Sequence, residues 1–211
     1  MNRFFGDNLT CFRGGRFVFA GLSFAVEEGG ALVLRGPNGS GKSSLLRMMA
    51  GLLPPSAGAL AWDDGRIDEE PEAHHERFHY VGHADAVKPV LTVAENVEFW
   101  ARLRTPEPDT RAALEAFGID RLADVPGRFL SAGQKRRVNL ARVLAAPVRL
   151  WLLDEPATAL DADAVRAVEA AIAAHRARGG MVVASTHQAL GLDGGDVLDL
   201  ADFQGEDLDI D

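Results

Sequence analysis

The most informative segment of this sequence reads Gly36-Pro37-Asn38-Gly39-Ser40-Gly41-Lys42-Ser43. It follows the apolar run Ala31–Leu34, which predicts a strand covered on both faces, and it precedes a helix predicted from Lys42 to about Ala50. This order fits the phosphate-loop pattern G-x-x-x-x-G-K-[ST] in its strand–loop–helix setting. The glycines let backbone N–H groups surround phosphate oxygens, and the helix N-terminus adds partial positive charge. A Gly-rich turn with a purely structural role is the alternative.

The end of this loop predicts specific contacts with a nucleotide. Lys42 would reach the β- and γ-phosphates, and the Ser43 hydroxyl would bind Mg²⁺. The predicted ATP-binding residues are Gly36, Pro37, Asn38, Gly39, Ser40, Gly41, Lys42, Ser43 and Ser44.

A second segment, Leu150–Glu155, consists of four apolar residues followed by two carboxylates. A buried strand that ends in Asp154 places its charge at the carboxyl edge of a parallel sheet, beside a phosphate loop. We therefore predict that Asp154 binds Mg²⁺ and that Glu155 is the general base for the attacking water. The alternative is a strand that simply ends in two solvated acids.

The segments around these two motifs predict an α/β fold. Leu150–Leu153, a helix from about Ala164 to Arg178 and Met181–Ser185 form a strand–helix–strand unit, which is typical of a parallel sheet. Aromatic and β-branched residues in Phe17–Phe19 and Leu22–Val26 predict short strands near the N-terminus.

The middle of the chain predicts a helical lobe hung on this sheet. Thr92 and Glu95 form a capping-box pattern, which starts a helix whose apolar face would hold Val93, Val97, Trp100 and Leu103. Two more helices are predicted over residues 109–117 and 134–146.

Composition excludes several classes of protein. The 211 residues are 47% hydrophobic and 25% charged, which is typical of a globular domain and not of a disordered or fibrous chain. The formal net charge of −9 argues against general nucleic-acid binding. The single cysteine, Cys11, excludes an intramolecular disulfide and favours a reducing compartment. The uncharged run 48–62 is too short and too broken by Pro and Gly to cross a bilayer.

One further motif carries a family resemblance. Leu130-Ser131-Ala132-Gly133-Gln134 precedes a predicted helix and resembles the signature of the ATP-binding cassette (ABC) ATPases. Thr158–Asp161 is similar to the D-loop of that family, and Ser185–His187 is similar to its switch-histidine segment. The resemblance covers nearly the whole chain, with its motifs in the family's order.

The resemblance implies a P-loop NTPase fold of the ABC nucleotide-binding type. Residues 1–211 would form a single ABC ATPase domain with a mainly parallel sheet core, an N-terminal antiparallel β lobe and an inserted helical subdomain. That subdomain would comprise about residues 84–127 and the signature helix 131–146, and residues 202–211 would form an acidic tail.

The resemblance also implies a homodimer that encloses two ATP molecules. The signature of one subunit would act on the ATP of its partner, Asp161 would lie at the same interface, and His187 would contact the γ-phosphate and position water together with Glu155. The signature residues are Ser131, Ala132, Gly133 and Gln134.

The sequence departs from the family pattern at two places. His83 stands where most members have a glutamine in the loop that joins the two lobes. Arg13, with Phe12 beside it, stands where most members have an aromatic residue that stacks on adenine, and a guanidinium can also stack on a base.

These departures, with the signature and Ser185–Gln188, resemble the ATP-binding subunits of the haem exporter of cytochrome c maturation. That resemblance implies an ATPase at the cytoplasmic side of a bacterial inner membrane, bound to integral membrane subunits. The alternatives are a small ABC transporter subunit with another cargo and a soluble, non-transport ABC ATPase.

Two groups of residues admit other interpretations. His75, His79 and His83 lie four residues apart and could bind metal or haem on a helix, but Phe78–Val81 predicts a strand and His74-His75 a solvated loop. We therefore expect no direct haem binding. Nucleic-acid contact is possible for a basic run in the helix after the signature, although a solvated helix face is the simpler interpretation. The run comprises Lys135, Arg136, Arg137 and Arg142.

Overall fold

The computed structural model describes residues 3–188 and 190–204. Two sheets form its framework. Five parallel strands in the order β6-β7-β8-β3-β9 make the central sheet, and four antiparallel strands in the order β2-β1-β4-β5 make the second. The central strands are β3 (Ala31–Arg35), β6 (Phe78–Val81), β7 (Leu150–Asp154), β8 (Met181–Ser185) and β9 (Asp196–Asp199).

The antiparallel sheet is built largely from the N-terminal hairpin. The two short segments expected from sequence, 17–19 and 22–26, form one continuous strand, β2, which pairs with β1 over most of its length. The strands are β1 (Arg3–Arg13), β2 (Arg16–Glu27), β4 (Ala57–Trp62) and β5 (Gly65–Arg66).

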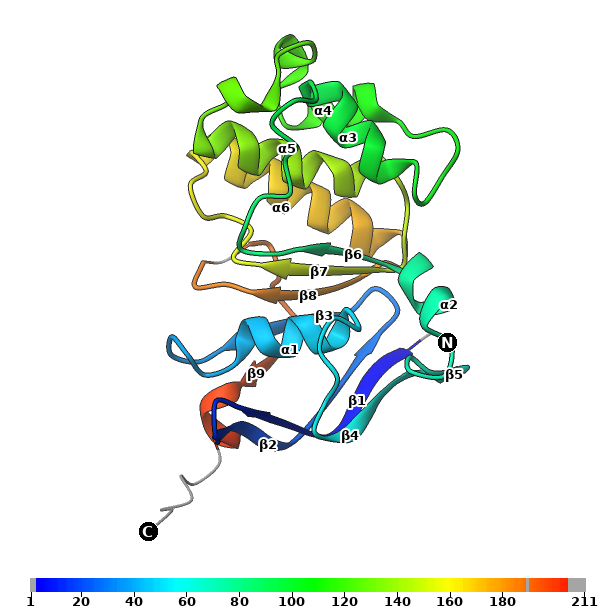
Figure 1. The fold of residues 1–211 in the computed structure, drawn as a ribbon, viewed down its shortest axis with the longest axis vertical. Helices are drawn as coiled ribbons and strands as arrows, with labels where there is room; N and C mark the ends of the chain where they lie inside the picture. The colour runs from blue at the N-terminus through cyan, green and yellow to red at the C-terminus, as the bar shows by residue number, and fades with distance from the viewer. Residues whose placement is uncertain (1–2, 189, 205–211) are drawn as a thin grey trace.

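The sheets and helices stack in layers (Figure 1). Helix α1 (Lys42–Met49) lies between the two sheets, and its Leu45, Leu46, Met48 and Met49 are fully buried there. Helices α5 (Ala132–Leu144) and α6 (Ala162–Ala177) cover the other face of the central sheet. The inner strands β3, β7 and β8 are therefore covered on both sides, which explains their continuous apolar runs, whereas the edge strand β9 is partly exposed.

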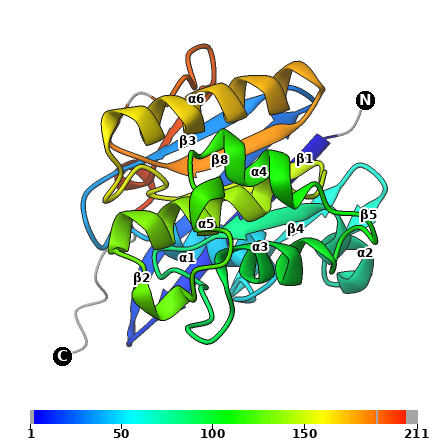
Figure 2. The ribbon, with the colours of Figure 1, turned by 90° about the horizontal axis from the view of Figure 1, so that it is seen from above.

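Helices α3 (Val93–Ala101) and α4 (Thr110–Ala116) pack on α5 at the end of the molecule far from the antiparallel sheet (Figure 1). Seen from above, these helices lie in front of the sheets (Figure 2). Thr92 and Glu95 form the expected capping box at the start of α3. Val93 and Val97 are buried, whereas Leu103 lies beyond the end of α3 and is 57% exposed. The predicted four-residue face was therefore wrong at its last member.

The segment around His74 also differs from its prediction. It forms a short helix, α2 (Pro71–Glu76), in which His74 is buried and not solvated. The His74 ring accepts a hydrogen bond from Trp62 Nε1 at 3.0 Å, and its Nε2 donates to the Met49 carbonyl at 2.9 Å. The described residues also form short 3₁₀ turns at Asp120–Leu122, Gly127–Phe129 and Leu200–Phe203. Residues 205–211 of the predicted tail lie outside the described residues.

Within residues 3–188 and 190–204, no helix is both long enough and apolar enough to span a membrane.

Candidate nucleotide site

A cavity of about 610 Å³ opens at the carboxyl ends of the central strands. The phosphate loop follows β3 and Asp154 ends β7, and β8 pairs with both of these strands. This strand order brings together two motifs that lie more than a hundred residues apart in sequence. The residues that line the cavity are Arg13, Gly14, Arg16, Val18, Asn38, Gly39, Gly41, Lys42, Ser43, Ser44, His83, Asp154 and Glu155.

The phosphate loop needs its glycines for two separate reasons. Gly41 has φ of 103°, and a Cβ there would lie 2.7 Å from Val18 Cγ1, so both backbone conformation and space exclude a larger residue. Gly36 has φ of 127°, and a Cβ there would lie 2.7 Å from Ser40 Oγ. The loop is therefore a tight turn whose backbone N–H groups can approach an anion.

Lys42 closes this loop across its own backbone. Its Nζ donates to the carbonyls of Gly36 at 2.7 Å and Pro37 at 3.0 Å. Lys42 is the first residue of α1 and is 9% exposed, so its charge lies at the helix N-terminus beside the cavity. An ammonium group held there adds to the positive end of the helix in attracting phosphate.

Asp154 is buried, with one carboxylate oxygen free to bind a cation. Its Oδ1 accepts a hydrogen bond from Ser185 Oγ at 2.6 Å, while its Oδ2 has no hydrogen-bond partner among the described residues. The residue is 3% exposed and lines the same cavity as Ser43. A free buried carboxylate oxygen and a nearby hydroxyl fit Mg²⁺, which takes few protein ligands and completes its shell with phosphate and water.

Glu155 is directed differently from its neighbour because its backbone takes a left-handed conformation, with φ of 47°. Its amide donates to Ser185 at the carbonyl (3.0 Å) and at Oγ (3.1 Å). Its Oε1 lies 3.6 Å from Nε2 of His187, which follows β8 and is 63% exposed at its side chain. The carboxylate and the imidazole therefore meet at the edge of the nucleotide cavity. His187 itself lines an adjacent cavity together with Gly36 and Pro37.

Other predicted contacts differ in position. His83 and Arg13 line the nucleotide cavity, whereas Phe12 is absent from its described lining and contacts Phe17 at a ring-centroid distance of 5.1 Å. Sequence reasoning missed Arg16, which pairs with Arg13 across the turn between β1 and β2. The sequence could have indicated Arg16, because residues paired across a hairpin turn lie side by side, and Arg13 was already expected at the nucleotide.

The signature lies at the start of α5, away from this cavity. Ser131 is its N-cap and forms a capping box with Gln134, with bonds of 3.2 Å and 2.9 Å. Gly133 packs closely on the D-loop, where a Cβ would lie 2.9 Å from the Ala159 carbonyl. None of the four signature residues, Ser131, Ala132, Gly133 and Gln134, is among the described residues that line the cavity.

Asp161 begins α6 as its N-cap, and its side chain is 63% exposed. The Ala164 amide donates to its Oδ1 at 2.9 Å, and Arg137 forms an ion pair with its Oδ2. The hydrogen bond from Ala164, with the Arg137 charge in support, lowers the pKa of Asp161. The carboxylate therefore stays charged at the surface next to the signature helix.

The basic run after the signature is not a solvated face. Arg136 is 3% exposed and Arg142 is 9% exposed, and both donate hydrogen bonds to backbone carbonyls of the central strands and their loops. Arg137 reaches the Phe117 carbonyl and Asp161. The prediction was wrong because the helix face that carries these cations turns toward the sheet, which offers carbonyl acceptors there.

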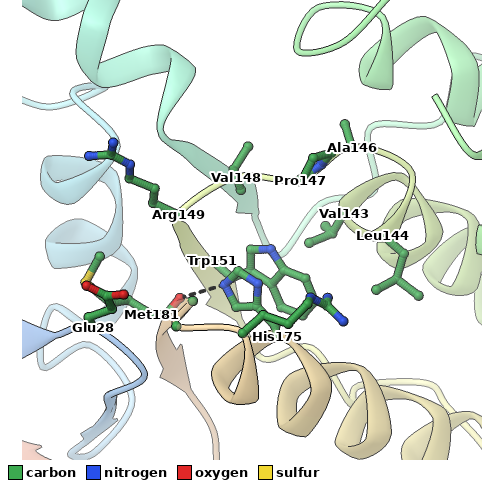
Figure 3. A pocket seen from close by; sticks show the side chains of 13 residues that line it. Glu28, Val143, Leu144, Ala146, Pro147, Val148, Arg149, Trp151, His175 and Met181 are labelled. Carbon is green, nitrogen blue, oxygen red and sulfur yellow. Dashed lines mark hydrogen bonds between the residues drawn. The ribbon is translucent and has the colours of Figure 1, made fainter. Parts of the chain in front are cut away.

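A separate cavity of about 520 Å³ lies at the opposite, amino-terminal edge of the central sheet (Figure 3). There the Trp151 indole stacks on His175, with ring centroids 4.0 Å apart. His175 Nε2 donates to the Met181 carbonyl at 3.2 Å, and burial lowers the pKa of His175 to about 4. None of the residues predicted to bind ATP lines this cavity, so it is distinct from the phosphate site.

The fold and the site together define a P-loop ATPase. A family model described as ABC transporter matches residues 19–158, and the chain belongs to this family. Two solved structures share the fold: an ATP-binding subunit of an ABC transporter has a TM-score of 0.83 at 24% identity and covers 93% of this chain and 85% of that one. An ABC transporter ATP-binding protein from Pyrococcus furiosus has a TM-score of 0.81 at 22% identity, and the match covers 96% of this chain and 100% of that one. The expected fold class is thus confirmed.

More particularly, the chain is similar to proteins named Cytochrome c biogenesis ATP-binding export protein CcmA. The one from Paramagnetospirillum magneticum is 59% identical over 205 residues, which are 95% of this chain and 94% of that protein. The one from Rhodospirillum rubrum is 59% identical over 201 residues, covering 95% and 86%. The one from Bradyrhizobium diazoefficiens is 49% identical over 189 residues, covering 89% and 93%.

Proposed function

We propose that the chain is the ATP-hydrolysing subunit of a membrane ABC complex that couples ATP binding and hydrolysis to haem export in c-type cytochrome biogenesis. The observation that best supports ATP hydrolysis is that one cavity is lined by Lys42, Ser43, Asp154 and Glu155. The names of the relatives support the assignment to cytochrome c biogenesis. In this proposal residues 1–211 act as one ABC ATPase domain, with a helical subdomain at about 84–127 and 131–146.

In this assignment the phosphate loop holds ATP through its backbone N–H groups. Lys42 would exchange its two loop carbonyls for the β- and γ-phosphates, since charged acceptors bind an ammonium more strongly than neutral carbonyls do. Ser43 and the free Oδ2 of Asp154 would hold Mg²⁺. The ion would neutralise charge on the phosphates during transfer.

Hydrolysis requires a base that orients and deprotonates water. Glu155 is our candidate because its carboxylate lies at the cavity and faces His187. His187 would contact the γ-phosphate and keep the water in line with it. His83 would sense the nucleotide from the lobe-joining loop, and Arg13 would stack on the base, with Phe12 beside it.

The signature supports a homodimer. Ser131, Ala132, Gly133 and Gln134 begin a helix whose N-terminus favours an anion, yet the cavity of their own subunit is lined by other residues. A partner's ATP would meet this helix end in a closed dimer. Asp161, exposed beside α5, would then lie at the same interface.

The membrane partners in this proposal are integral subunits of the complex, and the chain docks on them at the cytoplasmic side of a bacterial inner membrane. We propose no nucleic-acid partner and no direct haem binding by this chain. A subunit of another small ABC transporter with a different cargo is the second candidate, and a soluble, non-transport ABC ATPase is the third. The membrane proteins that co-purify with the chain discriminate among the three.

The haem assignment is tested by Lys42→Ala at the native locus, followed by a haem stain of c-type cytochromes. We expect those cytochromes to be lost while proteins with non-covalent haem stay normal, because the variant loses the charge that neutralises phosphate. Arg111→Ala is the control, since its side chain is 89% exposed and pairs with Glu115 of the same helix, α4. Normal c-type cytochromes in the Lys42→Ala strain would contradict the haem assignment but not the ATPase assignment.

A further inference from the structure

Arg136 is a buried cation in the second turn of α5, next to the catalytic strand. Its Nη2 donates to the carbonyls of Asp154 and Glu155, at 2.7 Å each. Its Nε donates to the Pro156 carbonyl at 3.3 Å, and its Nη1 donates to the Gly82 carbonyl at 2.9 Å. One side chain of the signature helix thus binds three consecutive carbonyls, of the last residue of β7 and the two residues after it, and one carbonyl of the lobe-joining loop.

The remaining N–H group of Arg136 donates to Asp85 Oδ1 at 3.4 Å, so all five guanidinium donors have partners. The charge is nevertheless costly to bury, because a second cation, Arg142, lies close by. Burial and the charge of Arg136 lower the pKa of Arg142 to about 10. A buried cation beside another is a poor source of net stability, and this arrangement indicates a role in holding geometry.

The geometry that needs holding is the backbone of Glu155. A left-handed φ of 47° is disfavoured for any residue with a Cβ. Ser185 binds the Glu155 amide from one side, and Arg136 binds the Glu155 carbonyl and the two carbonyls around it from the other. With both peptide groups held, the carboxylate stays directed toward His187 and the cavity.

We propose that Arg136 is a positioning residue for hydrolysis, which fixes the left-handed backbone of Glu155 and links it to the signature helix and to Gly82 beside His83. The inference rests on the proposed role of Glu155 as the base. Arg136 does not line the nucleotide cavity, so it acts through Glu155. A shift of the lobe-joining loop or of α5 would move the carbonyls that Arg136 holds, and with them the base.

The test compares Arg136→Gln and Arg136→Lys with Arg111→Gln, each in the full chain purified with its membrane partners. Arg136→Gln should lower kcat by about 10- to 100-fold, the range for misplaced catalytic groups. KM and the Kd of a non-hydrolysable ATP analogue should stay within about threefold, because the phosphate loop is untouched. Arg111→Gln, with an 89% exposed side chain, should leave kcat, KM and Tm unchanged.

Arg136→Lys should still lower kcat, because one ammonium group cannot bind four carbonyls at once. The loss should be smaller than in Arg136→Gln, because the positive charge is kept. This variant also carries the test if Arg136→Gln does not fold. A parallel rise of KM and of the analogue Kd with the fall in kcat would overturn the proposal, because it would indicate general distortion. The proposal would also be overturned if Arg136→Lys and Arg136→Gln both had the same kcat as the unaltered chain.

A double-mutant cycle separates this proposal from the assignment of the base. In a Glu155→Gln background, Arg136→Gln should lower the single-turnover rate no further, because a residue that acts through Glu155 has nothing left to position. An equal loss in both backgrounds would show that Arg136 acts independently of Glu155. If Glu155→Gln alone kept normal turnover, the assignment of the base would fail first, whatever Arg136 does.

Discussion

Two adjacent carboxylates, Asp154 and Glu155, have different chemistry because the chain turns between them. Asp154 is the last residue of β7 and is held by Ser185 Oγ in a buried site. Glu155 leaves the strand through a left-handed conformation, which directs its carboxylate toward His187. A cation ligand should be held in a fixed orientation, whereas a base for water should face the space that the water occupies. The local backbone therefore separates the two roles.

At this scale, Glu155→Gln should lower kcat by about 10²- to 10⁴-fold, the usual contribution of a general base. ATP binding should persist, because Lys42, Ser43 and Asp154 are unchanged. In the homodimer assignment, an ATP-bound dimer that cannot hydrolyse its nucleotide should accumulate on gel filtration. Monomeric variant protein with ordinary ATPase activity would contradict both assignments.

Helices α3 and α5 begin with the same device, a capping box. Thr92 and Glu95 form it in α3, and Ser131 and Gln134 form it in α5. The device satisfies two N–H groups at each helix start. At α5 it also fixes the end of the helix that, in our proposal, meets the partner's ATP. This pair of caps allows a structural contribution to be separated from a functional one.

Ser131→Ala and Thr92→Ala should each destabilise the fold by about 1 kcal/mol, the typical cost of losing an N-cap side chain. For a chain of this length, Tm should fall by about 2–4 °C in both variants. Only Ser131→Ala should also reduce ATPase activity, since Thr92 is remote from the nucleotide in every role proposed here. Calorimetry and a steady-state ATPase assay measure the two effects. Equal activities would remove the role of Ser131 at the nucleotide.

In the whole molecule, three buried histidines join separate elements. His74 of α2 binds Met49 and Trp62, His79 of β6 binds the Ala146 carbonyl at 2.9 Å, and His175 of α6 binds Met181. Burial lowers the pKa of each to about 4. Of the histidines spaced four residues apart, His79 serves packing on β6, whereas His75 is an exposed residue of α2 and His83 lies in the loop after β6 and lines the nucleotide cavity.

The fold should therefore lose stability in mild acid. The folded-state pKa values lie below the unfolded value of about 6.5, so the unfolded chain binds protons first as the pH falls. Between about pH 6.5 and 4 the free energy of unfolding should decrease by up to about 1.4 kcal/mol per pH unit for each histidine. Hydrogen-bonded arginines lower the pKa values of Asp64 and Asp68. These two carboxylates therefore affect stability only at still lower pH.

The measurement is denaturant unfolding at pH 7.5, 6.5, 5.5 and 5.0. His79→Leu should make the free energy of unfolding depend less steeply on pH, because one of the three buried histidines no longer contributes. Its absolute stability at pH 7.5 should also fall, because the hydrogen bond of His79 is lost. The exposed His75 provides the matched control, and His75→Leu should keep the full slope. A stability that does not change from pH 7.5 to 5.0 would contradict this prediction.

Much of the fold and site was predictable because its signals are local. The phosphate loop, the apolar strand ending in Asp154 and the capping box at Thr92 each lie within a few residues, where spacing reports backbone geometry directly. The order of strands and helices then leads to a parallel sheet. The signature and its neighbouring motifs indicated the ABC family, which the family model confirms.

The surroundings of polar side chains had no such local signal. Arg136 and His74 looked solvated in sequence, yet both are buried against carbonyls from distant segments. Arg16 lines the cavity and Phe12 turns to Phe17 because of hairpin pairing. A cation or a histidine is buried only where tertiary packing supplies acceptors, and no spacing along the chain encodes those. Sequence alone therefore established the motifs and the family, and folding established which charges are buried and what they hold.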